Sequence, residues 1–195
     1  MDNPFIESAF ISIFPGDGSE PIQFDKDYYY TIYYVPWNIM GTKLLSHVIF
    51  TAMDKFSQRY SVGFIYNKKT GKIMLASPDI TLNETTENTS HILDSGMFTP
   101  EQAERFNTLI SEFSEGEFKT KQGINIFYGK DSKNRDFSFF GNNCTTTLYR
   151  IFPNMMEKLG QCRTVVNSYS LTRMGGKKSR KRSKSFKFKT FRHFK

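Results

Sequence analysis

The basic residues of this chain are concentrated at its C-terminal end. Residues 173–195 carry 11 of the 27 lysines and arginines and none of the 19 acidic residues, so residues 1–172 hold 16 basic and 19 acidic side chains, a net charge of −3. Like charges at the density of the C-terminal stretch repel one another, and its few phenylalanines cannot form a core. We therefore expect a single folded domain over residues 1–172 and a disordered basic tail over residues 173–195.

The composition of this tail predicts binding to a polyanion, because lysine and arginine side chains that neutralise phosphates release bound counterions. Nucleic acid or another anionic partner would suit it, and a solubilising or nuclear-import segment is the alternative. The tail also resembles those of proteins encoded by large double-stranded DNA viruses, which implies a location in the virion or in the host cytoplasm or nucleus. The basic side chains expected to bind are Lys177, Lys178, Arg180, Lys181, Arg182 and Lys184.

Several protein classes are disfavoured by the sequence. The longest stretch without charged residues, 28–42, is interrupted by Pro36, so we expect no transmembrane segment. The first ten residues lack a basic leader and an apolar stretch, which argues against secretion. Two cysteines, Cys144 and Cys162, are too few for a disulfide scaffold and are read as thiols. Because the cysteines and the three histidines show no ligand spacing, we expect neither a metal nor a cofactor.

The first 172 residues show strand and helix patterns that predict an α+β fold. Residues 27–35 are rich in aromatic and β-branched side chains, and Pro36 is expected to end that strand. Residues 67–71 predict a hairpin loop within an antiparallel meander over residues 44–77. Residues 83–91 are polar and are expected to form a loop. Further strands are expected at 44–52, 60–66, 72–76 and 124–128.

Two helices are predicted. Thr99 is a suitable N-cap before Pro100, and apolar residues follow at helical spacing, which predicts a helix over residues 100–114. A second helix is expected to start at Asn142 or Asn143 and to be interrupted or ended by Pro153. This start would place Cys144 in the first turn.

A cysteine in the first turn of a helix is a candidate nucleophile, because unpaired backbone amides there stabilise a thiolate. A histidine would complete the activation by forming an ion pair and carrying the proton. His47 lies in a predicted strand, whereas His91 lies in the predicted loop and His193 in the tail. Cys144 and His47 are therefore the best pair available, with a packing cysteine and a structural histidine as the alternative.

These residues lie in segments that resemble a known group of enzymes. The segments LLSHVIFTAMDKFSQRYSVGFIYNKKTGKI, TPEQAERFNTLI and FFGNNCTTTLYRIF, within residues 40–155, are similar to circularly permuted papain-like hydrolases, which are relatives of the NlpC-type peptidases and the lecithin:retinol acyltransferase group. The resemblance implies a permuted papain-like fold, with a small antiparallel sheet packed against the helix that carries the cysteine. It implies Cys144 as the nucleophile and His47 as the base.

The same resemblance suggests how the site would be completed. A third polar residue often orients the imidazole, and Ser61 is the candidate, with Tyr60 as a weaker one. An alternative alignment places Ser61 where the base belongs and implies an inactive enzyme. The backbone N–H of Cys144 would bind the oxyanion, with Asn142 or Asn143 as a side-chain donor, although helix capping explains Asn143 equally well.

Two functions from different classes follow. The first is a thiol hydrolase that forms an acyl-enzyme on Cys144 and acts on a protein or acylated substrate, with peptide or isopeptide bonds ahead of lipid acyl chains. The second is a catalytically inactive, virion-associated structural protein that binds nucleic acid or an acidic partner through its tail. A simple nucleic-acid-binding module is a third and weaker reading.

Overall fold

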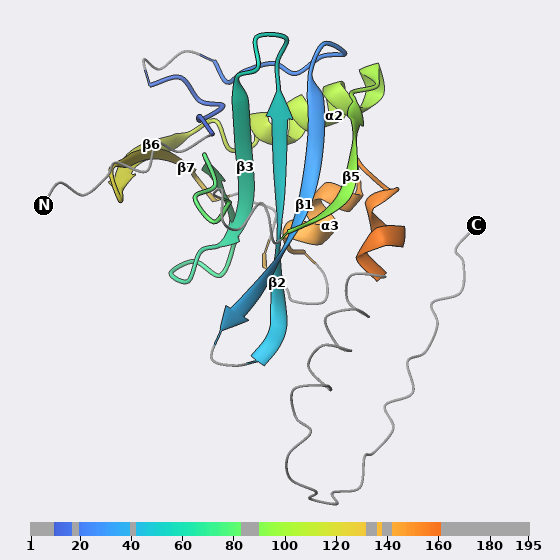
Figure 1. Cartoon of the computed structure of the whole chain (residues 1–195). Coiled ribbons are helices and arrows are strands. Elements are labelled where there is room, and N and C mark those ends of the chain that lie inside the picture. Colours follow the sequence, from blue (N-terminus) through green and yellow to red (C-terminus); the bar gives the residue numbers. More distant parts are fainter. Residues whose placement is uncertain are drawn as a thin grey trace, which may run out of the picture.

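The computed structural model describes residues 10–16, 20–39, 42–82, 90–131, 136–137 and 142–160. Within them the fold is α+β, as predicted, with one seven-stranded antiparallel sheet and few helices (Figure 1). The strand order is β5-β1-β2-β3-β4-β7-β6. The strands are β1 (Tyr29–Ile39), β2 (Thr42–Met53), β3 (Arg59–Tyr66), β4 (Ile73–Ser77), β5 (His91–Met97), β6 (Gly116–Lys121) and β7 (Ile124–Gly129). The labelled helices are α2 (Pro100–Ser111) and α3 (Cys144–Tyr149), and residues 155–160 are also helical.

The predicted meander forms the middle of this sheet. β2 pairs with β3 and β3 pairs with β4, all antiparallel, which confirms the meander over residues 44–77. The hairpin loop at 67–71 is also confirmed: the N–H of Asn67 bonds to the carbonyl of Lys72, and Gly71 has a φ of 74°. That positive φ suits glycine, which has no Cβ to clash with the backbone.

Strand β1 continues through Pro36, although the sequence led us to expect that this proline would end it. Its pairing with β5 stops at Tyr34, opposite His91, whereas its pairing with β2 runs on through Pro36. Beyond Tyr34, therefore, β1 has a neighbour on one side only among the described residues. A strand with one neighbour can hold a proline, because one side of its backbone makes no ladder hydrogen bonds.

Two strands were not expected from the sequence. β5 begins at His91, a residue assigned to a polar loop, and β6 covers residues that showed no strand pattern. Both lie at the edges of the sheet, and most of their side chains are at least partly exposed. Edge strands bury few side chains, so the alternation of apolar and polar residues that identifies a strand is weak.

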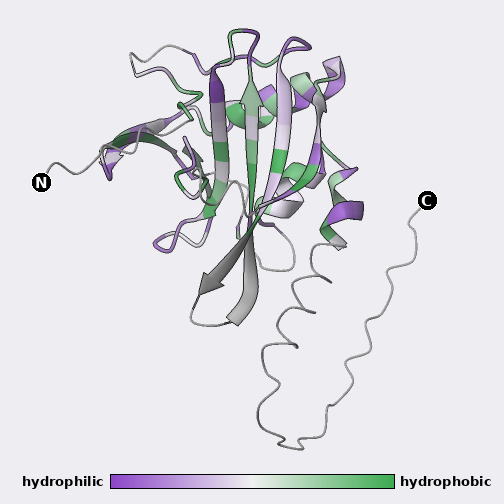
Figure 2. Cartoon of the chain, in the orientation of Figure 1, coloured by the Kyte–Doolittle hydropathy of each residue, from purple (hydrophilic) through white to green (hydrophobic). Residues whose placement is uncertain are grey.

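The larger core lies between the sheet and the helices. In the view of Figure 1, α2 and α3 both lie behind the sheet. Hydrophobic and hydrophilic residues alternate along α2, as Figure 2 shows, and its buried side chains join the same core as those of the strands. The two helices therefore cover one face of the sheet. Buried members of this core include Tyr30, Ile32, Phe50, Val62, Phe64, Phe106, Ile110 and Leu148.

Helix starts follow the predicted pattern. Thr99 caps α2 through a reciprocal capping box with Gln102, and Pro100 occupies the first helical position. The helix ends at Ser111, three residues before the predicted end. α3 starts at Cys144 and ends before Pro153, also as expected. In the part of the chain that the structure describes, these helices are too short and too polar to cross a membrane.

Candidate active site

Cys144 is held at the start of α3 by a helix cap. The side-chain oxygen of Asn143 accepts from the N–H of Thr146 at 3.0 Å, and the Thr146 hydroxyl accepts from the N–H of Asn143 at 2.9 Å. This reciprocal capping fixes the first turn and therefore the backbone of Cys144. The residue as a whole is partly buried and packs against the larger core.

His47 is held by β2 at the point where two strands separate. The last pair between β2 and β3 is Ile49↔Gly63, and in the described residues the part of β2 that precedes Ile49 pairs with β1 alone. α3 contacts both β2 and β3, and the N–H of Val48 on β2 is close enough to the Cys144 thiol to lower the pKa of that thiol. A long-range backbone contact thus places the thiol beside the strand that carries His47.

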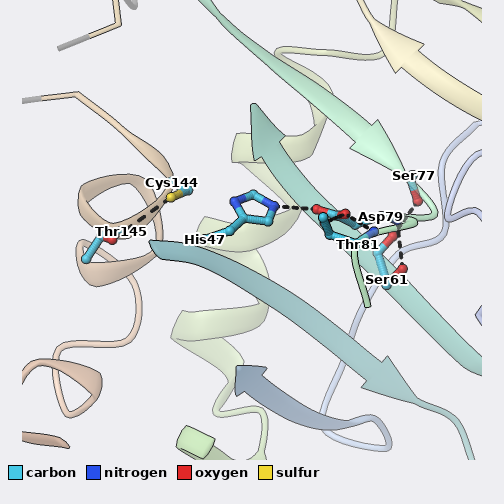
Figure 3. A network of polar contacts seen from close by, with 7 residues as sticks. All are labelled: His47, Ser61, Ser77, Asp79, Thr81, Cys144 and Thr145. Carbon is cyan, nitrogen blue, oxygen red and sulfur yellow. Dashed lines mark hydrogen bonds and ion pairs between the residues drawn. The ribbon is translucent and has the colours of Figure 1, made fainter. Parts of the chain in front are cut away.

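The imidazole of His47 lies between a thiol and a carboxylate. Its Nε2 is 2.6 Å from Oδ2 of Asp79, and the Cys144 thiol lies on the other side of the ring (Figure 3). His47 and Asp79 are 7% and 5% exposed, so solvent screens this ion pair little. Three residues from β2, α3 and the segment after β4 form a linear thiol–imidazole–carboxylate arrangement.

Asp79 is itself held by hydrogen bonds. Its Oδ1 accepts from both the N–H and the hydroxyl of Thr81, and its own N–H donates to the Ser61 hydroxyl at 2.9 Å. Behind it, the hydroxyl of Ser77 donates to the carbonyl of Ser61 at 2.7 Å and accepts from the N–H of Ile13 at 3.0 Å. The carboxylate therefore belongs to a buried polar network that leaves it one orientation.

The pKa values of the three groups are shifted by burial and by one another. Burial opposes the charge on His47, but the Asp79 carboxylate and the bonds to Asp79 and Cys144 raise its pKa to about 10. Burial opposes the charge on Asp79, and the attraction and hydrogen bond of His47 lower its pKa nonetheless. Burial also acts against the Cys144 thiolate, yet the bond and charge of His47 and the Val48 N–H lower the thiol pKa. The arrangement favours a thiolate–imidazolium pair near neutral pH.

Ser61, expected as the third member of the site, does not contact the His47 ring in the hydrogen bonds described above. The residue that accepts the hydrogen bond of the His47 ring is Asp79, and the Ser61 hydroxyl accepts the backbone N–H of Asp79. The side chain of Ser61 is fully buried on β3. The expectation is therefore corrected: a carboxylate orients the imidazole, and its charge offsets part of the cost of burying an imidazolium, which a neutral hydroxyl does far less well. Tyr60, the weaker candidate, is directed to Asp54 and Gln58.

The two asparagines before Cys144 have different partners. The side-chain oxygen of Asn143 caps α3, which is the structural alternative weighed for this residue. The side-chain oxygen of Asn142 accepts from the Arg150 guanidinium at 3.2 Å. Because Arg150 can only donate, this bond turns the amide so that its NH₂ group is directed away from Arg150. Asn142 is the better of the two as a donor to a bound anion.

Asp79 was missed by reasoning from sequence. It follows a proline after a short strand, and no periodic pattern or motif marks that position. The strand pairing does not bring that position to His47 either: Ala76 on β4 is level with Gly63 and Ile49, so the chain after β4 continues toward the Met53 end of β2. There the N–H of Asp79 bonds to the Ser61 hydroxyl, and its side chain reaches back to His47.

Other candidate residues lie apart from the site or outside the described residues. His91 is exposed at the start of β5. Cys162, His193 and the six basic residues of the tail expected to bind a polyanion fall outside the described part of the chain, as does the predicted boundary at residue 172. Within the described ranges, no group of three or more histidine, cysteine or acidic residues is arranged to hold a metal ion.

Comparisons of the chain with models of protein families, with curated proteins and with solved structures found no significant match.

Proposed function

We propose that this protein is a thiol hydrolase that uses Cys144 as its nucleophile. The observation that carries the proposal is the position of the His47 ring, which lies between the Cys144 thiol and the buried Asp79 carboxylate, to which it is hydrogen-bonded. A nucleophile, a proton carrier and a group that orients the carrier are the parts that acyl transfer requires.

In the first half of the reaction the Cys144 thiolate attacks the carbonyl carbon of an amide, ester or thioester. The new carbon–sulfur bond creates an oxyanion, which the backbone N–H of Cys144 and the side chain of Asn142 would stabilise. His47 donates its proton to the leaving amine, alcohol or thiol as the bond to the leaving group breaks. The product is an acyl-enzyme and a neutral imidazole.

In the second half a water molecule attacks the acyl group. The neutral imidazole of His47 accepts a proton from this water, the carbon–sulfur bond breaks, and a carboxylic acid and the thiolate are released. Asp79 keeps the ring in place and stabilises the imidazolium that forms again. Each turnover therefore consumes one water and returns the ion pair to its starting state.

The order of these residues supports a permuted papain-like fold as the architecture of the domain. His47 precedes Cys144 along the chain, His47 lies on a strand of an antiparallel sheet, and Cys144 opens a helix packed on that sheet. This is the order that the resemblance implies. The substrate class favoured by it is a peptide or isopeptide bond, with lipid acyl chains second.

A small activated ester tests the proposal without knowledge of the natural substrate. In a Cys162→Ser background, which leaves one thiol, p-nitrophenyl acetate should acetylate Cys144, seen as a mass increase of the intact protein, and release acetate in repeated turnovers. His47→Ala should slow acylation about 100- to 10,000-fold, because the thiolate loses its partner. His91→Ala is the matched control, an exposed histidine on β5 that should leave the rate unchanged.

Equal acylation rates in the parent and the His47→Ala protein would contradict the proposal. That result would favour the inactive structural protein that the alternative alignment of Ser61 implies. In that case Cys144 would serve only as a packing residue at the start of α3.

A further inference from the structure

Gly63 lies at the last pair of the ladder between β2 and β3. It is opposite Ile49 on β2 and opposite Ala76 on β4. His47 is two residues from Ile49, so its side chain leaves β2 on the same face of the sheet as that of Ile49. A residue at position 63 is therefore a near neighbour of the catalytic histidine proposed above.

The space where a side chain at position 63 would lie is occupied by Asp79. A Cβ on residue 63 would overlap Oδ2 of Asp79, the oxygen that bonds to His47, and would lie 2.7 Å from its Cγ. Real Cβ atoms essentially never approach another heavy atom within 3.0 Å. Any residue other than glycine would thus compete directly with the carboxylate for its place.

The carboxylate has little freedom to move aside. Its other oxygen is bonded to Thr81, its backbone N–H is bonded to Ser61, and Asp79 is almost fully buried. Glycine in the interior of a strand weakens the strand and is typical of positions where another group approaches the backbone closely. Here the approaching group is the partner of His47.

We propose that Gly63 is a positioning residue of the active site: its missing side chain provides the space through which the Asp79 carboxylate reaches His47. This inference rests on the proposed function for its consequence in catalysis. Its structural part concerns only the contact between positions 63 and 79. The two parts can therefore be tested separately.

The test compares single-residue variants in the Cys162→Ser background by the pH profile of Cys144 alkylation with iodoacetamide. In the parent, alkylation should continue well below pH 7, and Asp79→Ala should move the midpoint toward the ordinary thiol pKa of about 8.5. Gly63→Ala should move it in the same direction, because the displaced carboxylate no longer supports the imidazolium. Besides His47, Asp79 and Cys144, one titratable group senses this carboxylate among the described residues: Tyr128, whose pKa is raised by burial and by the charge of Asp79.

The matched control is Gly96→Ala on β5. A Cβ at position 96 would have Tyr30 as its nearest neighbour at 3.8 Å, an ordinary van der Waals contact, so its profile should equal that of the parent. The double variant Gly63→Ala with Asp79→Ala should show no change beyond that of Asp79→Ala alone, because the contact that the first change disrupts is already gone.

A folded Gly63→Ala protein with the parent profile would overturn the inference. If Gly63→Ala does not fold, the folding of the double variant tests the inference instead. Removal of the Asp79 carboxylate should restore folding, and a double variant that also fails to fold would overturn the inference. An ordinary thiol profile in the parent would instead contradict the proposed function, and the folding comparison would still test the contact between positions 63 and 79.

Discussion

At the scale of single residues, His47 is the centre of the site, because its ring lies between the proposed nucleophile, Cys144, and the buried carboxylate of Asp79. Cys144 and His47 could be proposed from sequence because local patterns fix their surroundings: a helix start for one and a strand for the other. Asp79 could not, because its role depends on a contact across 32 positions between a strand and the segment after another strand. Ser61 was chosen in its place since it lies on the strand next to β2.

The role of Asp79 can be tested by the pH dependence of turnover. Asp79 raises the pKa of His47 against the effect of burial, so its removal should lower that pKa. Asp79→Asn should therefore lose the imidazolium at a lower pH than the parent, and the alkaline limb of the p-nitrophenyl acetate profile should move toward neutral pH. The matched control is Asp94→Asn. The Asp94 carboxylate lies on the edge strand β5, where it accepts a hydrogen bond from the Tyr30 hydroxyl. An alkaline limb that stays in place would contradict the role of Asp79.

At the scale of secondary structure elements, sequence patterns predicted the elements with strong periodicity. The meander of β2, β3 and β4 and the start of α2 were predicted because apolar alternation and capping residues act locally. β5 and β6 were not, since edge strands bury few side chains. The end of β1 was misplaced because a proline is tolerated wherever its strand has lost one neighbour, and pairing partners are not visible in the sequence.

The start of α3 offers a prediction that separates capping from catalysis. Asn143→Ala should reduce the free energy of unfolding by about 1 kcal/mol, because the cap of α3 is lost, and Asn143→Asp should restore most of it. Asn142→Ala should change stability by less than about 0.5 kcal/mol, as surface substitutions do, but should slow acylation by p-nitrophenyl acetate about 100-fold. Urea unfolding and ester turnover measure the two effects. An Asn142→Ala protein with full activity would remove Asn142 from the oxyanion site.

At the scale of the whole molecule, charge divides the chain into a slightly acidic part that contains the site and a basic C-terminal stretch. The site depends on contacts among β2, β3, the segment after β4 and α3, all within residues 47–144. The basic stretch contributes 11 positive charges with no acid among them. Catalysis and binding to a polyanion should therefore be separable properties of the chain.

Truncation after Leu171 tests this separation. The parent should bind mixed-sequence double-stranded DNA with an affinity that falls steeply with salt, because each neutralised phosphate contributes about 0.9 to the slope of log K against log salt. The truncated protein should lose this binding and keep its ester turnover. A full-length variant with the order of residues 173–195 shuffled is the matched control and should bind as the parent does. Unchanged affinity after truncation would contradict the role of the tail.

The central claim is that His47 forms a charged link between a thiolate and a buried carboxylate. It is tested most directly by the protonation state of the His47 ring, read from the ¹⁵N chemical shifts of its two nitrogens across pH 5 to 9 with residue-specific assignment. We expect His47 to remain doubly protonated at pH 8, above the ordinary histidine pKa of 6.5, and to become neutral at a lower pH in Asp79→Asn. A His47 ring that is neutral at pH 8 in the parent and unaffected by Asp79→Asn would contradict the account.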